Sequence, residues 1–476
     1  MLALTSRTRR ARLILKSQDR TPFDFQAGAA AQCLKAIDER GRLLVEAPTG
    51  SGKTLISQLA VAMLAEELED RLPRVLVVVP SRSLLVQHFE DAAWLGPSFG
   101  LAIHRVDPDA PMSLVQAMMR GFGVVHATPI TLKNRLSALP NGLSMLASFD
   151  AVVFDEIDTY LTVDELEERR DTWPILQMCC EAELPILGFT GTHLTSKQEN
   201  AWTQHGFTKI EAEVPEDWLP FTRVQFIAVE DGRVVLEDDR IRDEMRQAFH
   251  VLTDKFGFVT WGQITRLAQN GEASARRILR LSTERLRLFE SPEYMGAKLA
   301  VIVSEADKDG PTLLLSRFRD TARLMEQKMP TVDSSVVRAD GSMSRSDIGI
   351  AMNQFRAMPT GTKGALVITR ELGGRGLDFP SAAQVVVASP RSNYQAVAQE
   401  LARIRSRRSR PKTAVITYYA DTEEQAKARR LGGHLALETY GTSALFEVTD
   451  MPPDTYKLDA FEGRTLVYQE SLVAPW

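Results

Sequence analysis

Short, unbroken apolar runs alternate with longer polar segments along most of this chain. In the first 225 residues these runs are rich in Val, Ile and Leu, and they lie at 43–47, 75–80, 124–128, 151–154 and 185–189. Runs of this kind predict parallel strands that are buried on both faces between crossover helices. The same rhythm returns at 311–316, 335–338, 364–369, 383–388 and 413–418. We therefore expect an α/β fold with two parallel-sheet domains in tandem.

A different pattern separates the two sets of strands. Residues 226–297 are rich in Arg, Glu and Leu at helical spacing and hold almost no β-branched runs, which predicts a helical insertion or linker. We assign residues 1–225 to the first domain, 298–440 to the second, and 441–476 to an irregular C-terminal tail. Within the insertion, residues 260–288 could form a helix-turn-helix with its turn at Asn270-Gly271, but an amphipathic bundle with a solvated basic face explains the pattern better.

Composition excludes some classes of protein but does not indicate a function. The 476 residues are 44% hydrophobic and 25% charged with a formal net charge of -5, which is ordinary for a soluble globular protein and excludes a histone-like one. Three cysteines are too few for a disulfide framework and lack zinc-site spacing. We find no membrane-length apolar run and no secretion signal, so we expect a cytoplasmic protein without a membrane partner.

The strongest local signal is the sequence APTGSGKT at residues 47–54, between a predicted strand and a helical run. Small residues let backbone N–H groups point at a phosphate chain beside a helix N-terminus, a lysine and a hydroxyl. A chance Gly/Ser loop is the alternative. The pattern predicts ATP binding, with Lys53 catalytic and Thr54 a ligand of Mg²⁺. The candidate nucleotide-binding residues are Thr49, Gly50, Ser51, Gly52, Lys53 and Thr54.

A second signal follows the predicted strand at 151–154, where the sequence continues Asp155-Glu156-Ile157-Asp158. Two adjacent carboxylates at the end of a buried strand are costly to desolvate unless a cation lies beside them. We expect Asp155 to hold Mg²⁺ through its water shell and Glu156 to act as the general base on the attacking water. The alternative is an ordinary helix N-terminal turn, where carboxylates suit the helix dipole.

These motifs, in this order, resemble the superfamily 2 helicases and translocases of the DEAD/DEAH type over roughly residues 20–420. That family has two RecA-like domains with ATP in the cleft between them. The resemblance implies nucleic-acid-facing loops at Ser81, Arg82 and Gln87 and at Thr128. It also implies a coupling motif that contains Thr190 and Thr192. More loosely, the chain is similar to the Hef/FANCM and RNA-sensor-like branches.

An upstream element and two downstream motifs extend the resemblance. Phe23-Asp24-Phe25-Gln26 resembles the family's adenine-reading element and implicates Gln26, with Gln32 as an alternative. Residues 313–320 resemble motif IV. The sequence TRELGGRGLD at 369–378 resembles motif V, in which Thr369 and Gly373 would face nucleic acid and Gly376 and Asp378 would face ATP.

Motif VI departs from the family pattern. The sequence QELARIRSR keeps Gln399 and Arg403, but Ala402 stands in place of the usual Gly and Ser406 in place of the final Arg. The resemblance implies that Gln399 and Arg403 are catalytic, with Arg403 as the arginine finger. Whether Arg405 or Arg407 supplies a second guanidinium, or both belong to a solvated helix, stays open.

The sequence as a whole predicts an ATP- and Mg²⁺-dependent helicase or translocase that moves along or remodels a nucleic acid, with DNA favoured over RNA. An ATP-driven switch or scaffold subunit that binds nucleic acid without unwinding it is the alternative, and either could work with protein partner subunits. A metabolic P-loop kinase or a transporter ATPase would share only the first two motifs.

Overall fold

The computed structural model of the chain divides into two compact units between residues 219 and 220, and each is described by itself. The structure describes residues 2–21, 23–48, 50–139, 141–160, 173–191, 194, 196–215, 219, 221–306, 310–329, 335–359, 361–370, 372, 379–391, 394–402, 404, 406, 410–436 and 445–456. Thr49, Thr192, Gly373, Gly376, Asp378, Arg403, Arg405 and Arg407 lie outside these residues.

The first unit is a seven-stranded parallel sheet in the order β3-β4-β2-β5-β6-β1-β7. The strands are β1 Arg42–Glu46, β2 Arg74–Val78, β3 Ile103–Arg105, β4 Gly123–Ala127, β5 Ala151–Phe154, β6 Ile186–Thr190 and β7 Phe207–Glu211. The helices are α1 Leu2–Ser17, α2 Asp24–Asp38, α3 Lys53–Glu67, α4 Arg82–Asp91, α5 Leu95–Phe99, α6 Met112–Arg120, α7 Pro129–Ser137, α8 Gly142–Leu146, α9 Trp173–Glu181 and α10 Ser196–Gln204, with a 3₁₀ turn η1 at Ile157–Thr159.

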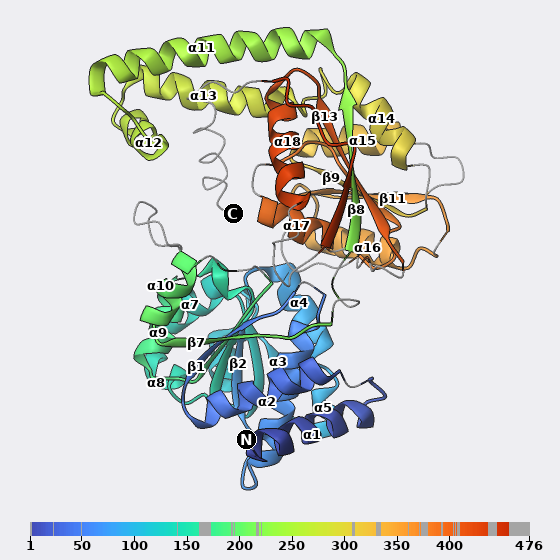
Figure 1. Cartoon of the computed structure of the whole chain (residues 1–476). Helices are drawn as coiled ribbons and strands as arrows, with labels where there is room; N and C mark the ends of the chain where they lie inside the picture. The colour runs from blue at the N-terminus through green and yellow to red at the C-terminus, as the bar shows by residue number, and fades with distance from the viewer. Residues whose placement is uncertain are drawn as a thin grey trace. The chain divides into compact units, whose positions relative to one another are not determined.

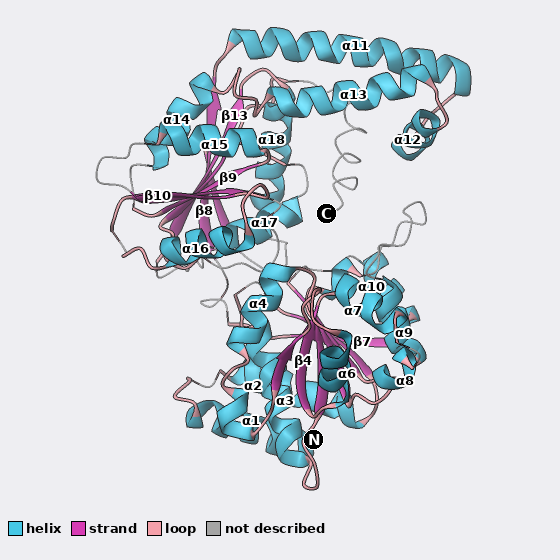
Figure 2. Ribbon diagram, turned by 180° about the vertical axis from the view of Figure 1, so that it is seen from behind, coloured by secondary structure: helices cyan, strands magenta, loops and turns pink. Residues whose placement is uncertain are grey.

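Helices cover both faces of this sheet (Figure 2). Successive side chains of a strand point to opposite faces, so Leu43 and Val45 pack with α1 to α5 while Leu44 packs with α6 to α9. Because both faces are covered, the central strands need apolar residues at every position. This requirement explains the unbroken runs in the sequence.

The second unit is also a seven-stranded parallel sheet, in the order β10-β11-β9-β12-β13-β8-β14. Its strands are β8 Phe221–Val229, β9 Thr312–Ser316, β10 Ser335–Ala339, β11 Gly364–Thr369, β12 Gln384–Val387, β13 Lys412–Tyr419 and β14 Leu445–Thr449. Its helices are α11 Gly232–Phe256, α12 Trp261–Gln269, α13 Ala273–Leu288, α14 Gly296–Ala306, α15 Arg319–Lys328, α16 Arg345–Arg356, α17 Tyr394–Ala402 and α18 Glu423–Ala436.

The two sheets have the same topology. When the strands of each unit are numbered from its own first strand, both sheets read 3-4-2-5-6-1-7. The loop that leaves β1 leads into α3, whereas the chain that leaves β8 leads into the α11–α13 helices. The predicted fold of two tandem parallel-sheet domains is therefore confirmed, and the helical segment occupies the position that the phosphate loop and its helix occupy in the first unit.

The structure divides the chain differently from the sequence-based boundaries. Residues 221–225, which we assigned to the first domain, begin β8, and β8 lies between β13 and β14 in the second sheet. The helical segment thus follows the first strand of the second unit instead of joining two complete domains. Leu445–Thr449, which we assigned to the tail, pairs with β8 as the edge strand β14.

The helices α11 and α13 lie side by side, as Figure 1 shows. Apolar side chains of α11, α12 and α13 form one buried cluster with Val229 and Tyr419 of the sheet. The predicted turn at Asn270-Gly271 does separate α12 from α13, and Gly271 has φ +96°. Among the described residues, no helix is both long and apolar enough to cross a bilayer.

Candidate nucleotide site and nucleic-acid interface

The predicted phosphate loop joins β1 to α3 at the carboxyl edge of the first sheet. Gly50 and Gly52 have φ of +78° and +89°, a backbone conformation that residues with a side chain rarely adopt. Lys53 begins α3, and its Nζ donates to the backbone oxygen of Ala47 over 3.3 Å. Among the described residues, Gly52 provides no side-chain cap for α3, and such a helix N-terminus suits an anion.

Gln26 lies against this loop. Its amide is 5% exposed, and Nε2 donates to the backbone oxygen of Ser51 over 2.8 Å. A Cβ at Gly52 would lie 2.6 Å from the same Nε2, and the φ of +89° would strain any residue other than glycine there. Among the described residues Oε1 of Gln26 has no hydrogen-bond partner. The structure thus places Gln26 on the loop with an acceptor left for a ligand.

The two motif carboxylates follow β5 at the same edge of the sheet. Asp155 and Glu156 are 7% and 8% exposed, and Glu156 has φ +48°. Burial acts to raise the pKa of Asp155, but the hydrogen bond with His88 and the charges of His88 and Lys53 hold it below its usual range. Asp155 is therefore ionised when a ligand binds to the site.

The residues around Asp155 fit a divalent cation. His88 Nε2 lies 3.2 Å from Asp155 Oδ2 and 3.5 Å from Thr54 Oγ1, so the motif I hydroxyl and the motif II carboxylate both contact one imidazole nitrogen. Hydroxyl and carboxylate oxygens are the ligands that Mg²⁺ prefers in proteins. Thr54 and Asp155 are thus brought together as the sequence predicts.

The coupling motif touches the carboxylate motif directly. Thr190 is the last residue of β6, and its hydroxyl donates to Oδ1 of Asp158 over 3.0 Å. Gly188, two residues earlier, faces Ile157 so closely that a Cβ would lie 2.3 Å from its side chain. The end of β6 therefore packs and hydrogen-bonds against the turn that follows Glu156.

Each of the two loops predicted to face nucleic acid, at Ser81 and at Thr128, leads into the N-terminus of a helix. Ser81 caps α4 by accepting from the Leu84 N–H, and Thr128 caps α7 by accepting from the Thr131 N–H. Because β2 and β4 are parallel neighbours, both caps lie at the same sheet edge as the phosphate loop. Helix N-termini suit phosphate groups. Arg82 beside them is exposed, and Gln87 is half-buried.

In the second unit the structure describes Thr369 and Arg370 of motif V. Thr369 ends β11 and is buried. Arg370 Nη2 donates to the Ser389 oxygen over 2.7 Å, and Nε lies 3.8 Å from Glu400 Oε2 of α17. Burial lowers the pKa of Arg370 to about 10, against the opposing charge of Glu400. Gln399 lies on α17, and its side chain is not among those described.

Comparison with protein families places both halves of the chain. A model described as DEAD/DEAH box helicase matches residues 26–200, and one described as helicase conserved C-terminal domain matches residues 296–407. Together these matches span more than half of the chain. The chain belongs to the DEAD/DEAH-box helicases of superfamily 2.

This DEAD/DEAH-box protein is similar in sequence to curated relatives and in fold to solved structures. It is 32% identical over 158 residues to the DEAD-box ATP-dependent RNA helicase 7 of Spinacia oleracea. The aligned region covers 30% of this chain and 22% of the spinach protein. The S. cerevisiae Dbp5 structure bound to RNA and ADP BeF3 has a TM-score of 0.57 at 14% identity and covers 93% of this chain and 94% of Dbp5. The Pyrococcus furiosus Hef helicase domain has a TM-score of 0.50 at 16% identity and covers 84% of this chain and 96% of that domain.

One residue at the DEAD/DEAH-box nucleotide site escaped the sequence analysis. His88 lies on α4 directly after Gln87, the last residue assigned to the first nucleic-acid loop. Its contacts with Thr54 and Asp155 span 34 and 67 residues of sequence. The only local signal is a histidine next to the apolar residues Leu84, Leu85 and Phe89 of a mixed helix, a pattern that a satisfied core histidine also gives.

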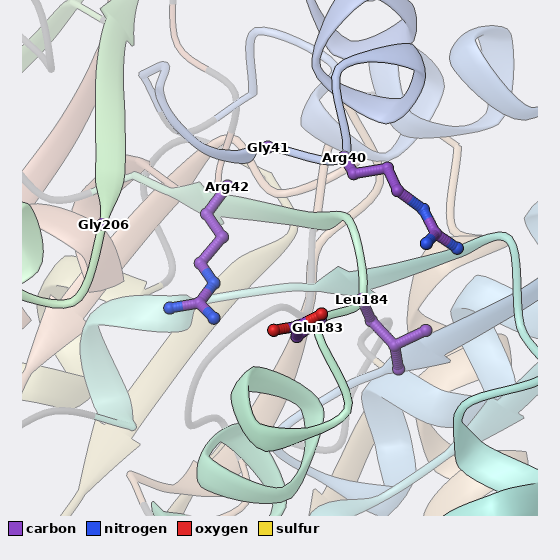
Figure 3. Close-up of a pocket in the computed structure, with 6 residues that line it drawn as sticks. All are labelled: Arg40, Gly41, Arg42, Glu183, Leu184 and Gly206. Carbon is purple, nitrogen blue, oxygen red and sulfur yellow. The ribbon is translucent and has the colours of Figure 1, made fainter.

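This helicase-family chain has a cavity of about 320 Å³ at the amino edge of the first sheet, opposite to the edge that holds the phosphate loop (Figure 3). Its walls come from the amino ends of β1, β6 and β7, and Figure 3 shows Arg40 and Arg42 on either side of Glu183. Arg42 donates to the backbone oxygens of His205 and Cys180. The cavity is therefore separate from the candidate nucleotide site, and the backbone contacts give Arg42 a structural role. Its lining residues are Arg40, Gly41, Arg42, Glu183, Leu184 and Gly206.

Proposed function

We propose that this chain is an ATP-dependent RNA helicase or translocase. The observation that carries the proposal is that three motifs far apart in sequence lie together: Gln26 lies on the phosphate loop, and Asp155 and Thr54 both contact His88. The matched segment covers only about a fifth of the spinach relative's length, so activity and substrate are proposed for this chain on its own residues.

Each residue of the first unit has a chemical task in this proposal. Lys53 leaves the Ala47 carbonyl and binds the phosphates, while Gln26 offers Oε1 to the adenine amino group. A Mg²⁺ ion held by Thr54 and Asp155 would neutralise charge on the phosphates. Glu156 takes the proton of the attacking water.

The second unit contributes to hydrolysis through motifs V and VI. We propose that Gln399 and Arg403 act on the γ-phosphate, with Arg403 supplying a fixed guanidinium as negative charge develops there. Gly376 and Asp378 belong to the same ATP-facing set. Arg405 and Arg407 are the candidates for a second guanidinium. These six assignments rest on the motif pattern of the family.

The nucleic-acid strand is proposed to run along the capped helices at the sheet edges. Ser81 and Thr128 each cap a helix whose N-terminus suits a phosphate, and Thr369 and Gly373 are proposed to face the strand in the second unit. Contacts with the backbone carry little sequence information and weaken steeply with salt. We therefore expect binding with little sequence preference.

RNA is the favoured substrate. The curated relatives matched by this chain are named as RNA helicases, and Dbp5 was solved with RNA bound. Our sequence-based preference for DNA has no support from those relatives. The coupling pair Thr190 and Asp158, together with Thr192, is proposed to transmit the state of the ATP site to the bound strand.

A strand-displacement assay tests the proposal. The full chain, Mg²⁺ and ATP are mixed with a labelled duplex that carries a single-stranded tail, in RNA and DNA versions. We expect ATP-dependent release of the labelled strand, faster for RNA than for DNA. Hydrolysis stimulated by RNA without release of either strand would favour the ATP-driven switch, and faster release from DNA would reverse the substrate assignment.

A further inference from the structure

A row of exposed side chains follows one face of α13. Its members are Arg276, Arg280, Thr283 and Arg287, all of them exposed, and we call them the arginine row. Their spacing of four, three and four residues places them on one side of the helix, opposite the side that packs into the buried cluster. The row extends over about 16 Å of the helix axis. It is therefore a continuous basic face and not a set of scattered charges.

The arginines of this row have no carboxylate partner among the described residues. Arg276 donates to the backbone oxygen of Ala268, and Arg287 lies over the ring of Phe318. The neighbouring helix α11 differs, because its arginines all pair with acidic side chains, namely Arg233, Arg240, Arg242 and Arg246. Glu284, the one acidic residue of α13, pairs with Arg240. The positive charge of the row is thus left uncompensated within the described part of the chain.

The carboxyl end of α13 is fixed to the edge of the second sheet. Glu290 is buried, its Oε2 accepts from the N–H of Arg317 over 2.6 Å, and its carbonyl accepts from the hydroxyl of Thr321. Arg317 directly follows β9, whose last residue Ser316 pairs with Thr369 of β11. Thr369 is one of the residues proposed to face nucleic acid. The row therefore ends beside the edge along which the strand is proposed to run.

Two exposed arginines of α15 continue the basic face at this edge. Arg319 begins α15, and Arg323 follows one turn later. Phe318, the N-cap residue of α15, provides no side-chain cap and lies 5.7 Å from the guanidinium of Arg287. Asp320 between the two arginines is exposed and pairs with neither of them. The contact of Arg287 with Phe318 thus joins the face of α13 to that of α15.

We propose that the arginine row binds the phosphate backbone of the RNA strand that passes Thr369. Guanidinium groups match phosphate oxygens, and arginines without carboxylate partners keep their donors for such contacts. An acidic protein would also suit the charge, but a continuous polyanion accounts for the joined faces of α13 and α15. The inference rests on the proposed function, and it extends the bound strand beyond the helicase motifs onto the helical segment.

The salt dependence of RNA binding tests this role. We would measure the affinity of the full chain for a labelled, mixed-sequence single-stranded RNA, with Mg²⁺ and a non-hydrolysable ATP analogue present. The double variant Arg280→Gln, Arg287→Gln removes two phosphate contacts. It should weaken binding about tenfold and reduce the slope of log affinity against log salt by about 1.4.

A matched double variant on α11 controls for net charge. Arg240→Gln, Arg246→Gln removes the same charge from arginines that already pair with Glu237, Glu244 and Asp243. Its RNA affinity should stay within about twofold of wild type, because no phosphate contact is lost. Equal RNA affinities of the two double variants would overturn the proposal and favour an acidic partner protein as the occupant of the row.

Crosslinking of the wild-type chain needs no substitution, so it stands even if a variant fails to fold. RNA that contains 4-thiouridine is bound, irradiated and digested, and the crosslinked peptides are identified by mass spectrometry. We expect crosslinks within residues 276–288 of α13. RNA that binds but crosslinks only outside the helical segment would overturn the role of the row while the proposed function stands. If the full chain binds no RNA, the proposed function fails together with this inference.

Discussion

The hydroxyl of Thr190 donates a 3.0 Å hydrogen bond to the carboxylate of Asp158. Thr190 ends the strand β6, and Asp158 lies in the short turn that begins after Glu156. The end of β6 is therefore tied directly to the turn that follows Glu156. The bond gives a physical basis for a coupling role of Thr190 that does not involve contact with ATP.

Replacing Thr190 with Val removes this hydrogen bond while keeping the shape of the side chain. We expect ATP hydrolysis to stay within about twofold of wild type, because Lys53, Asp155 and Glu156 are untouched, while strand displacement falls about tenfold. The cost in stability should be about 1 kcal/mol. Thr190→Ser, which retains the hydroxyl, is the matched control. Equal losses of hydrolysis and displacement in the valine variant would argue against coupling.

Gly52 tests the contact between Gln26 and the phosphate loop. Alanine at this position combines a φ of +89° with a Cβ placed 2.6 Å from Gln26 Nε2. We expect ADP affinity, measured by calorimetry with Mg²⁺ present, to fall at least tenfold, or about 1.4 kcal/mol.

The control for that substitution is Gly28→Ala on α2. No atom lies within 4 Å of the new Cβ, and alanine favours a helix over glycine by about 0.5–1 kcal/mol. ADP affinity should be unchanged in Gly28→Ala. If Gly52→Ala binds ADP as tightly as this control, the contact between Gln26 and the phosphate loop is not needed for ADP affinity.

A buried ion cluster holds the helical segment to the second sheet. Arg285 of α13 binds Asp238 of α11 through Nε at 2.5 Å and Nη2 at 2.9 Å, and its Nε lies 3.2 Å from Glu423 of α18. Arg285→Met leaves the buried Asp238 without this cation, while Glu423 keeps its contact with Lys427, and the loss costs about 3–5 kcal/mol. We expect much faster hydrogen exchange in α11 and α13.

The exposed arginine Arg240 is the matched control for Arg285. It pairs with Glu237, Glu244 and Glu284, all at the surface of the helical segment. Arg240→Met should change stability by less than about 1 kcal/mol, because solvent screens such pairs. Similar hydrogen exchange in the two variants would mean that the buried cluster does not anchor the segment.

The pH dependence of stability should reveal His126. Burial, with a smaller effect of His88, lowers its pKa to about 3, although the His104 carbonyl opposes the shift. Below about pH 6.5 the unfolded chain takes up a proton that the folded chain refuses, so stability falls by up to about 1.4 kcal/mol per pH unit. We expect the free energy of unfolding of the first unit, measured with denaturant, to fall less steeply between pH 7 and 5 in His126→Asn than in wild type. Identical slopes would contradict a buried, neutral His126.

Most central strands were predictable, and so was the edge strand β10 at 335–338, but the edge strands β3, β7 and β14 were not. A strand buried on both faces needs an apolar residue at every position, and β2 and β11 show this as continuous runs. The half-exposed edge strands β3 and β14 leave no such run. Strand β8 alternates buried and exposed residues, which is why the sequence placed its first residues in the wrong unit.

Local motifs predicted the site residues, whereas contacts between motifs required the fold. The phosphate loop and the Asp155-Glu156 pair each have a sequence pattern dictated by their chemistry. The contact of His88 with Asp155 depends on the pairing of β2 with β5, which brings the helix after one strand beside the turn after the other. No spacing within the sequence encodes that adjacency.

The most direct test of the account is the steady-state rate of ATP hydrolysis by the full chain, with and without single-stranded RNA. We predict at least tenfold stimulation by RNA, loss of the stimulated rate at high salt, and no turnover by Glu156→Gln, which should still bind ATP. A hydrolysis rate that is the same with RNA, with DNA and with no polynucleotide would contradict the proposal that this chain is a nucleic-acid-dependent ATPase.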